Sequence, residues 1–129
     1  QPNQLILLSP WIDLTHSNLE MKAIEKQDKM LKINLLDEAA AKYKGSLSLT
    51  DYRVSPLYGD LQNLPPTSIF IGTHDILFPD SKKLRDKLVT NKVKTYYFEY
   101  QKSFHVWMAL TFSREAKHAN KQIVKLLLD

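Results

Sequence analysis

The sequence predicts an α/β protein in which parallel strands alternate with helices, and two observations predict this class. Apolar or β-branched runs alternate along the chain with segments of helical spacing. The runs at Leu5–Leu8 and Thr67–Ile71 lack the regular polar alternation of a half-exposed strand, as is typical of parallel strands covered on both faces. Right-handed crossovers would bring the carboxyl ends of such strands to one edge of the sheet, where functional groups gather.

The N-terminal part is expected to form one strand and two helices. Leu5–Leu8 forms the strand, and the Ser-Pro pair that follows ends it. From His16 to about Gly45 the spacing becomes helical. Asn34 is expected to cap the second helix, which ends at Gly45. The apolar stripe expected in the first part of this segment consists of Leu19, Ala23, Met30 and Leu31.

A long connection separates these helices from the next strand. Residues 46–66 show little periodicity and are rich in proline, glycine and serine. Connections of this length inside compact domains are often functional. The strand at Thr67–Ile71 follows, and a helix then begins at Pro79 with Leu84 and Leu88 on its buried face.

The C-terminal part is expected to add a strand and a helix. Val93–Tyr100 is rich in β-branched and aromatic residues, which favours a strand. Ser113 is expected to cap the last helix. The apolar stripe of that helix is predicted to contain Ala116, Ala119, Ile123 and Leu127. The length of 129 residues fits one domain or part of a larger one.

The composition argues against several classes of function. The net charge is +4, but the 18 lysines and arginines are interleaved with acidic residues, as in Glu25–Lys29. This pattern favours solvated helix faces over a nucleic-acid surface. No apolar run is long enough to span a bilayer, and the lack of cysteine excludes disulfides and thiolate metal sites. No cofactor is expected, and a cytoplasmic location is expected in the absence of a leader sequence.

Two polar residues follow the ends of predicted strands. Asp75 comes just after Thr67–Ile71, and His105 comes just after Val93–Tyr100. Adjacent parallel strands would place both at the same edge of the sheet. A carboxylate that accepts a hydrogen bond from one ring nitrogen of a histidine leaves the other nitrogen to activate a serine. The order acid and then histidine also matches the chain order of α/β-hydrolases.

Less specific interpretations of the same residues remain open. An aspartate after a strand is commonly a turn former or a helix cap, and a histidine between Phe104 and Val106 can be a core residue. A metal site formed by His74, Asp75 and His105 is conceivable, because imidazole and carboxylate are good ligands. Nothing in their spacing requires one.

Several motifs in this order resemble the C-terminal third of the hormone-sensitive-lipase-like esterases. They are "SPWIDLT" near the start, "SPLYGDLQNLPPTSIFIGTHDILFPDSKKL" and "YFEYQKSFHVW". These esterases are α/β-hydrolases that cleave carboxylic esters of short to medium acyl length. The resemblance implies the C-terminal part of an α/β-hydrolase fold, with three parallel strands, flanking helices and a helical cap insertion at about residues 16–64.

The resemblance also implies roles for individual residues. Asp75 matches the catalytic acid of the family, and His105 matches its catalytic histidine. Trp11, Phe104 and Trp107 would lie near the substrate cleft, although each is at least as well explained as a packing residue. The expected partner of the complete enzyme is a small-molecule ester. A peptidase with the same triad remains an alternative.

The chain lacks the other half of the catalytic machinery. None of its serines lies in a Gly-x-Ser-x-Gly elbow, and no His-Gly-Gly-Gly stretch is present. In the resembling family both features precede the matched region, so the chain is expected to be an inactive fragment of an esterase. Its strand at Leu5–Leu8 would then expose an edge and could mediate self-association. The alternative is a non-catalytic interaction module derived from a hydrolase.

Overall fold

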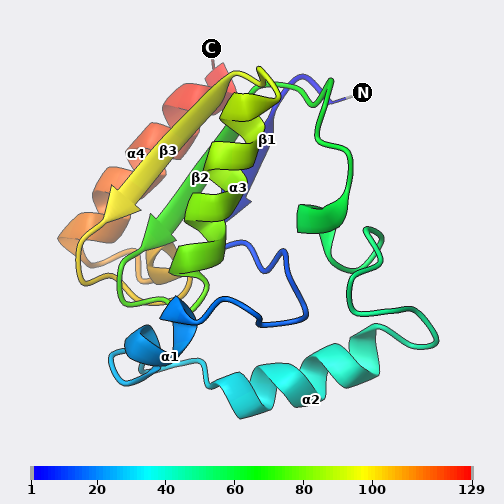
Figure 1. Cartoon of the computed structure of the whole chain (residues 1–129). Coiled ribbons are helices and arrows are strands. Elements are labelled where there is room, and N and C mark those ends of the chain that lie inside the picture. The colour runs from blue at the N-terminus through cyan, green and yellow to red at the C-terminus, as the bar shows by residue number, and fades with distance from the viewer. Residues whose placement is uncertain (1, 129) are drawn as a thin grey trace.

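A three-stranded parallel sheet forms the centre of the protein in the computed structural model, which describes residues 2–128 (Figure 1). Its strands lie in the order β1 (Leu5–Leu8), β2 (Thr67–Gly72) and β3 (Thr95–Tyr100). β2 is buried along its whole length because it has a strand on each side and a helix on each face. The predicted α/β class with three parallel strands is confirmed.

Two helices cover the two faces of the sheet (Figure 1). α3 (Phe78–Thr90) covers one face, where Leu84 and Leu88 pack with Ile69 of β2 as predicted. α4 (Arg114–Leu128) covers the other face, where it packs with Phe70, the next residue of β2. Successive strand residues point to opposite faces, so β2 contributes to both cores.

The predicted stripe of α4 is correct at its start and wrong at its end. Ser113 caps the helix as predicted, because its Oγ accepts a hydrogen bond from the Ala116 amide at 3.1 Å. Ala116 and Ala119 are fully buried, but Leu127 is 63% exposed and Leu126 packs on the core instead. Residues 126 and 127 lie three and four positions after Ile123, so the 3.6-residue period alone does not choose between them.

The connection between β1 and β2 extends beyond the carboxyl ends of the strands (Figure 1). It contains α1 (Glu20–Glu25), α2 (Ile33–Tyr43) and a single turn of 3₁₀ helix at Pro56–Tyr58. We call residues 9–66, which include these elements, the insertion. Within residues 2–128, no helix is long and apolar enough to cross a membrane.

Two predictions about the insertion are wrong. Asn34 lies inside α2 rather than at its cap, because the Ile33 amide donates to Glu25 Oε1 at 2.8 Å and the helix begins at Ile33. Of the predicted stripe, Leu19, Ala23 and Met30 are exposed and Leu31 packs on the core, whereas Met21 is fully buried. The cause is a tight turn after α1, which breaks the periodicity that the sequence suggested across the whole segment.

Candidate active site

Two loops meet at the carboxyl ends of β2 and β3, where Gly72 is paired with Tyr100. The Thr73 amide donates to the Tyr100 carbonyl at 3.0 Å, and the His74 amide donates to the Ser103 carbonyl at 3.0 Å. The amide of Lys102 donates to Thr73 Oγ1 at 2.8 Å. These bonds hold together the loop that carries Asp75 and the loop that carries His105.

Gly72 permits this close approach, which the sequence pattern did not lead us to expect. A Cβ atom at position 72 would lie 2.1 Å from the Ser103 carbonyl oxygen and 2.5 Å from its carbon. Both atoms belong to the backbone, so any side chain would push the two loops apart. Its position at the end of an apolar run was the available signal, since a glycine there often marks a close backbone contact.

Asp75 and His105 are in direct contact. Oδ2 of Asp75 lies 3.0 Å from Nδ1 of His105. The aspartate side chain is fully buried, whereas the histidine side chain is 22% exposed. A carboxylate can only accept, so Nδ1–H donates and Nε2 carries the lone pair. Among residues 2–128, Nε2 has no hydrogen-bond partner.

The carboxylate of Asp75 is fixed by the start of α3. Its Oδ1 accepts from the Leu77 amide at 2.9 Å, and its carbonyl accepts from the Phe78 amide at 2.9 Å. The Asp75 amide in turn donates to the Gly72 carbonyl at 3.1 Å. Both carboxylate oxygens therefore have partners, and only one of them faces the imidazole.

The backbone next to His105 is held in an unusual conformation. Val106 has φ 52°, in the left-handed region that β-branched residues rarely adopt. Its amide donates to Oγ of Ser9 at 3.0 Å, and Ser9 itself has φ 46°. Such strain persists where the surroundings over-determine it, and it is concentrated at functional sites. The residue that follows β1 therefore helps to orient the histidine loop.

The three residues predicted to lie near a substrate cleft have different environments. Trp107 is 2% exposed and packs with Phe70 in the core beneath α4, and Phe104 packs against the same cluster. The indole N–H of Trp11 donates to the Asp13 carbonyl at 3.2 Å and to Nε2 of His16 at 3.0 Å. These contacts give all three a structural role, and their contact with substrate stays a prediction.

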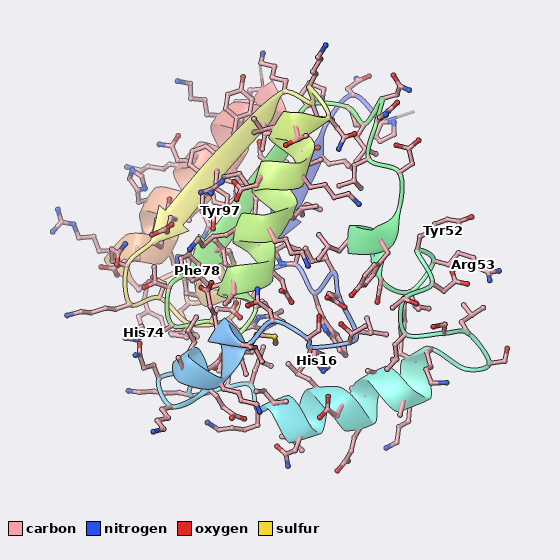
Figure 2. The ribbon with its side chains drawn as sticks, in the orientation of Figure 1. His16, Tyr52, Arg53, His74, Phe78 and Tyr97 are labelled. Atoms are coloured by element: carbon pink, nitrogen blue, oxygen red, sulfur yellow. The ribbon has the colours of Figure 1, made fainter. Side chains whose placement is uncertain are left out.

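A second aspartate–histidine contact was not foreseen. Nδ1 of His16 lies 2.7 Å from Oδ1 of Asp37 on α2, and Nε2 of His16 accepts from Trp11. Figure 2 shows His16 on the part of the insertion between β1 and α1, above α2. No sequence signal linked these residues, which are 21 positions apart across the turn between two helices.

A buried carboxylate lies between the sheet and the insertion. Asp80, in the first turn of α3, is 1% exposed, and its Oδ2 has no partner within residues 2–128. Burial raises the pKa of Asp80, the hydrogen bond from Asn18 opposes the shift, and nearby Asp13 raises the pKa further. Over the same described range, no group of three metal-ligating side chains could hold an ion. The structure therefore gives no support to a metal site formed by His74, Asp75 and His105.

The sequence and the structure both match known hydrolases. A sequence model described as the alpha/beta hydrolase fold matches residues 1–109. An esterase of Acinetobacter venetianus is 34% identical over 96% of this chain. A triacylglycerol lipase of Mycobacterium tuberculosis is 27% identical over 85% of it.

Solved structures give the same result. An esterase from the bacterial hormone-sensitive lipase family superposes with a TM-score of 0.94 at 28% identity over 98% of this chain. The protein EstE5 superposes with a TM-score of 0.88 at 31% identity over 92% of it.

The match covers only part of each relative. The chain spans 42% of the Acinetobacter esterase and 21% of the Mycobacterium lipase. It spans 43% of the hormone-sensitive-lipase-family structure and 40% of EstE5. Within that portion the backbone superposes closely on both solved structures. The chain therefore belongs to the α/β-hydrolase family, among the esterases that resemble hormone-sensitive lipase.

Proposed function

We propose that this chain supplies the acid and the histidine of a serine carboxylic-ester hydrolase. Asp75 is the acid, His105 is the general base, and the nucleophilic serine comes from a segment outside these 129 residues. The observation that carries the proposal is the 3.0 Å contact between a fully buried carboxylate and a partly exposed imidazole. The kinship with esterases and lipases supports an ester as the substrate class.

The proposed chemistry divides one difficult step into two. Nε2 of His105 takes the proton of the serine hydroxyl while Oγ forms a bond to the ester carbonyl carbon. The same proton is then given to the departing alkoxide as the C–O bond breaks, which leaves an acyl-enzyme. Water repeats the sequence and releases the acid. Asp75 holds the Nδ1–H tautomer and stabilises the imidazolium in both halves.

The insertion is part of this proposal as a cap over the acyl group. α1 and α2 lie beyond the carboxyl ends of the strands (Figure 1). The loops that follow β2 and β3 and carry Asp75 and His105 begin at the same end of the sheet. In that position the insertion can enclose a substrate whose ester group reaches His105. Trp11 is the predicted substrate-contacting residue of this part of the chain.

The first experiment reads the source DNA upstream of the Gln1 codon, in frame. We expect codons for a Gly-x-Ser-x-Gly elbow, preceded by a His-Gly-Gly-Gly stretch that supplies oxyanion-hole amides. The longer product should then hydrolyse p-nitrophenyl butyrate, and Asp75→Asn should lower its kcat by about 10⁴-fold. An in-frame stop, or an unrelated upstream sequence, would contradict the proposal.

A second function is favoured by the free side of β1. This strand has a neighbour only on its β2 side within residues 2–128, and Leu8 is 39% exposed. An apolar cavity of about 310 Å³ lies beside it, lined in part by Leu5, Leu7 and Leu64. Unpaired strand edges recruit partners. The isolated chain is therefore proposed to self-associate through Leu5–Leu8.

Light scattering after size-exclusion chromatography tests this second proposal. We expect a species larger than one 15.0 kDa chain, with dissociation on dilution. A monodisperse monomer that unfolds cooperatively at high temperature would rule out association through the edge. The longer product is the natural comparison, because any segment that pairs with β1 would remove the unpaired edge.

A further inference from the structure

We infer that Asp28 is a positioning residue for the Asp75–His105 pair, an inference that rests on the proposed function. Asp28 lies in the turn between α1 and α2 and is 2% exposed. It is 48 residues from the loop that follows β2, yet its carboxylate bonds directly to that loop. The catalytic acid is therefore fixed from the insertion as well as from the sheet.

The two oxygens of Asp28 serve two different parts of the molecule. Oδ1 accepts from the amides of Met30 at 2.8 Å and Leu31 at 2.9 Å, which closes the turn into α2. Oδ2 accepts from the amide of Ile76 at 2.8 Å. One buried side chain thus joins the insertion to the residue immediately after the catalytic acid.

The bond to Ile76 fixes the direction of the Asp75 side chain. Two consecutive backbone amides just before α3 donate to two different carboxylates. The Ile76 amide donates to Asp28, and the Leu77 amide donates to Asp75 itself. If the Ile76 amide lost its acceptor, the peptide could rotate and the Asp75 carboxylate would move with it. Ile76 and Leu77 are buried with Met21 and Leu36 of the insertion, so water cannot readily replace the lost acceptor.

The arrangement also links the insertion to catalysis. A movement of the turn at Asp28 would be transmitted to Asp75 through one carboxylate, with no intermediate side chain. A substrate that orders the insertion would therefore also order the acid. This predicts that Asp28 affects the chemical step and leaves substrate affinity almost unchanged.

The experiment compares Asp28→Asn with Glu25→Gln. Glu25 is a suitable control because its Oε1 accepts from the Ile33 amide at 2.8 Å, within the insertion and without contact to the Asp75 loop. An asparagine at position 28 keeps one oxygen that can accept a hydrogen bond. Its NH₂ group cannot accept, so either the Ile76 amide or the amides of Met30 and Leu31 lose their acceptor. We expect Asp28→Asn to lower kcat of the longer enzyme by about 10- to 100-fold, with KM changed by less than about twofold.

A second readout does not need activity. Long-range ¹H–¹⁵N spectra of the imidazole nitrogens report the tautomer of His105 in the 129-residue chain. We expect the Nδ1–H form in the wild type, a mixture of tautomers in Asp28→Asn, and the wild-type spectrum in Glu25→Gln. If Asp28→Asn does not fold, Asp28→Ser replaces it, since a serine can still close the turn but cannot reach Ile76.

The outcomes separate the two proposals. An unchanged His105 tautomer and an unchanged kcat in the Asp28 variants would overturn the positioning role. Equal losses of kcat in Asp28→Asn and Glu25→Gln would also overturn it, because they would indicate general damage to the insertion. Absence of esterase activity in the longer wild-type protein would contradict the proposed function, while the tautomer comparison would still decide the role of Asp28.

Discussion

The protein contains two aspartate–histidine contacts with opposite arrangements. In the Asp75–His105 pair the carboxylate is fully buried and the imidazole is 22% exposed. In the His16–Asp37 pair the imidazole is 2% exposed and the carboxylate 60% exposed. The distances, 3.0 Å and 2.7 Å between Nδ1 and the nearest carboxylate oxygen, do not distinguish a catalytic pair from a structural one.

The environment of Nε2 does distinguish them. Nε2 of His16 accepts from the Trp11 indole, so both ring nitrogens are used to hold parts of the insertion together. Nε2 of His105 has no partner among residues 2–128 and can take a proton from an incoming group. A histidine with both nitrogens engaged stabilises a fold, whereas one with a single engaged nitrogen can act as a base.

The largest expected effect comes from removing each histidine in the longer enzyme. His105→Ala should lower kcat for ester hydrolysis by at least about 10⁴-fold, because no other base replaces it. His16→Ala should lower kcat by less than about tenfold and act mainly on stability. Initial rates with p-nitrophenyl butyrate, normalised to folded protein, give both values. Equal losses in the two variants would break the distinction between the pairs.

The next effect concerns the close contact between Gly72 and the Ser103 backbone, which brings together the loops that carry Asp75 and His105. Gly72→Ala should destabilise the chain by at least about 3 kcal/mol or prevent folding, because its methyl group would collide with the Ser103 backbone. Gly45→Ala is the control: Gly45 has φ +57°, but a methyl group there would meet no atom within 4 Å. Its cost should be about 1 kcal/mol. Urea unfolding measures both, and similar values would contradict the close-contact argument.

A smaller effect should follow from changing the donor to His16. Trp11→Phe removes the indole N–H and should cost about 1–2 kcal/mol of unfolding free energy. The Nε2 resonance of His16 should shift, while the Asp37 carboxylate keeps the Nδ1–H tautomer. Trp107→Phe is a matched control, because the Trp107 indole nitrogen is buried without a partner within residues 2–128. The same change there loses packing but no hydrogen bond. A change in the His16 spectrum in both variants would contradict the assigned donor.

The smallest effect concerns Asp80, a buried carboxylate with one oxygen that lacks a partner within residues 2–128. Its pKa is raised on folding, so the folded state holds its proton more tightly than the unfolded state does. Stability therefore falls as pH rises from the ordinary value of 3.8 through the raised folded value. The side chain of Asp80→Asn does not titrate. The unfolding free energy of this variant should therefore rise by up to about 1 kcal/mol relative to the wild type across that pH window. Urea unfolding from about pH 4 to about pH 7 gives the comparison. A pH-independent difference would exclude this origin.

The sequence predicted the elements that local patterns control. Strand β1 at Leu5–Leu8, the start of β2 at Thr67 and the cap at Ser113 agree with the structure. β3 was predicted from Val93 but begins at Thr95, because the Val93 amide still donates to the Leu88 carbonyl of α3 at 3.0 Å. The contact between Asp75 and His105 was predictable from the alternation of strands and helices. Their catalytic role remains a prediction.

The supports of the candidate site could not be predicted in the same way. Asp28 was one of several charges in a solvated stretch, and only the tertiary fold buries it against Ile76. Ser9 and Val106 are far apart in the sequence, and neither carries a pattern that indicates the other. Spacing arguments work when one regular element separates two residues, and they fail when an irregular insertion determines the contact.

The hydrogen bond between Ser9 and Val106 has a consequence for the order of folding. The two residues are 97 positions apart, whereas Asp28 and Ile76 are 48 apart and Asp75 and His105 only 30. Loop closure costs more entropy for longer separations, and non-local contacts slow folding. The Asp75–His105 pair can therefore meet early, within a β2–α3–β3 unit. Its final geometry forms only when the first and last parts of the chain come together.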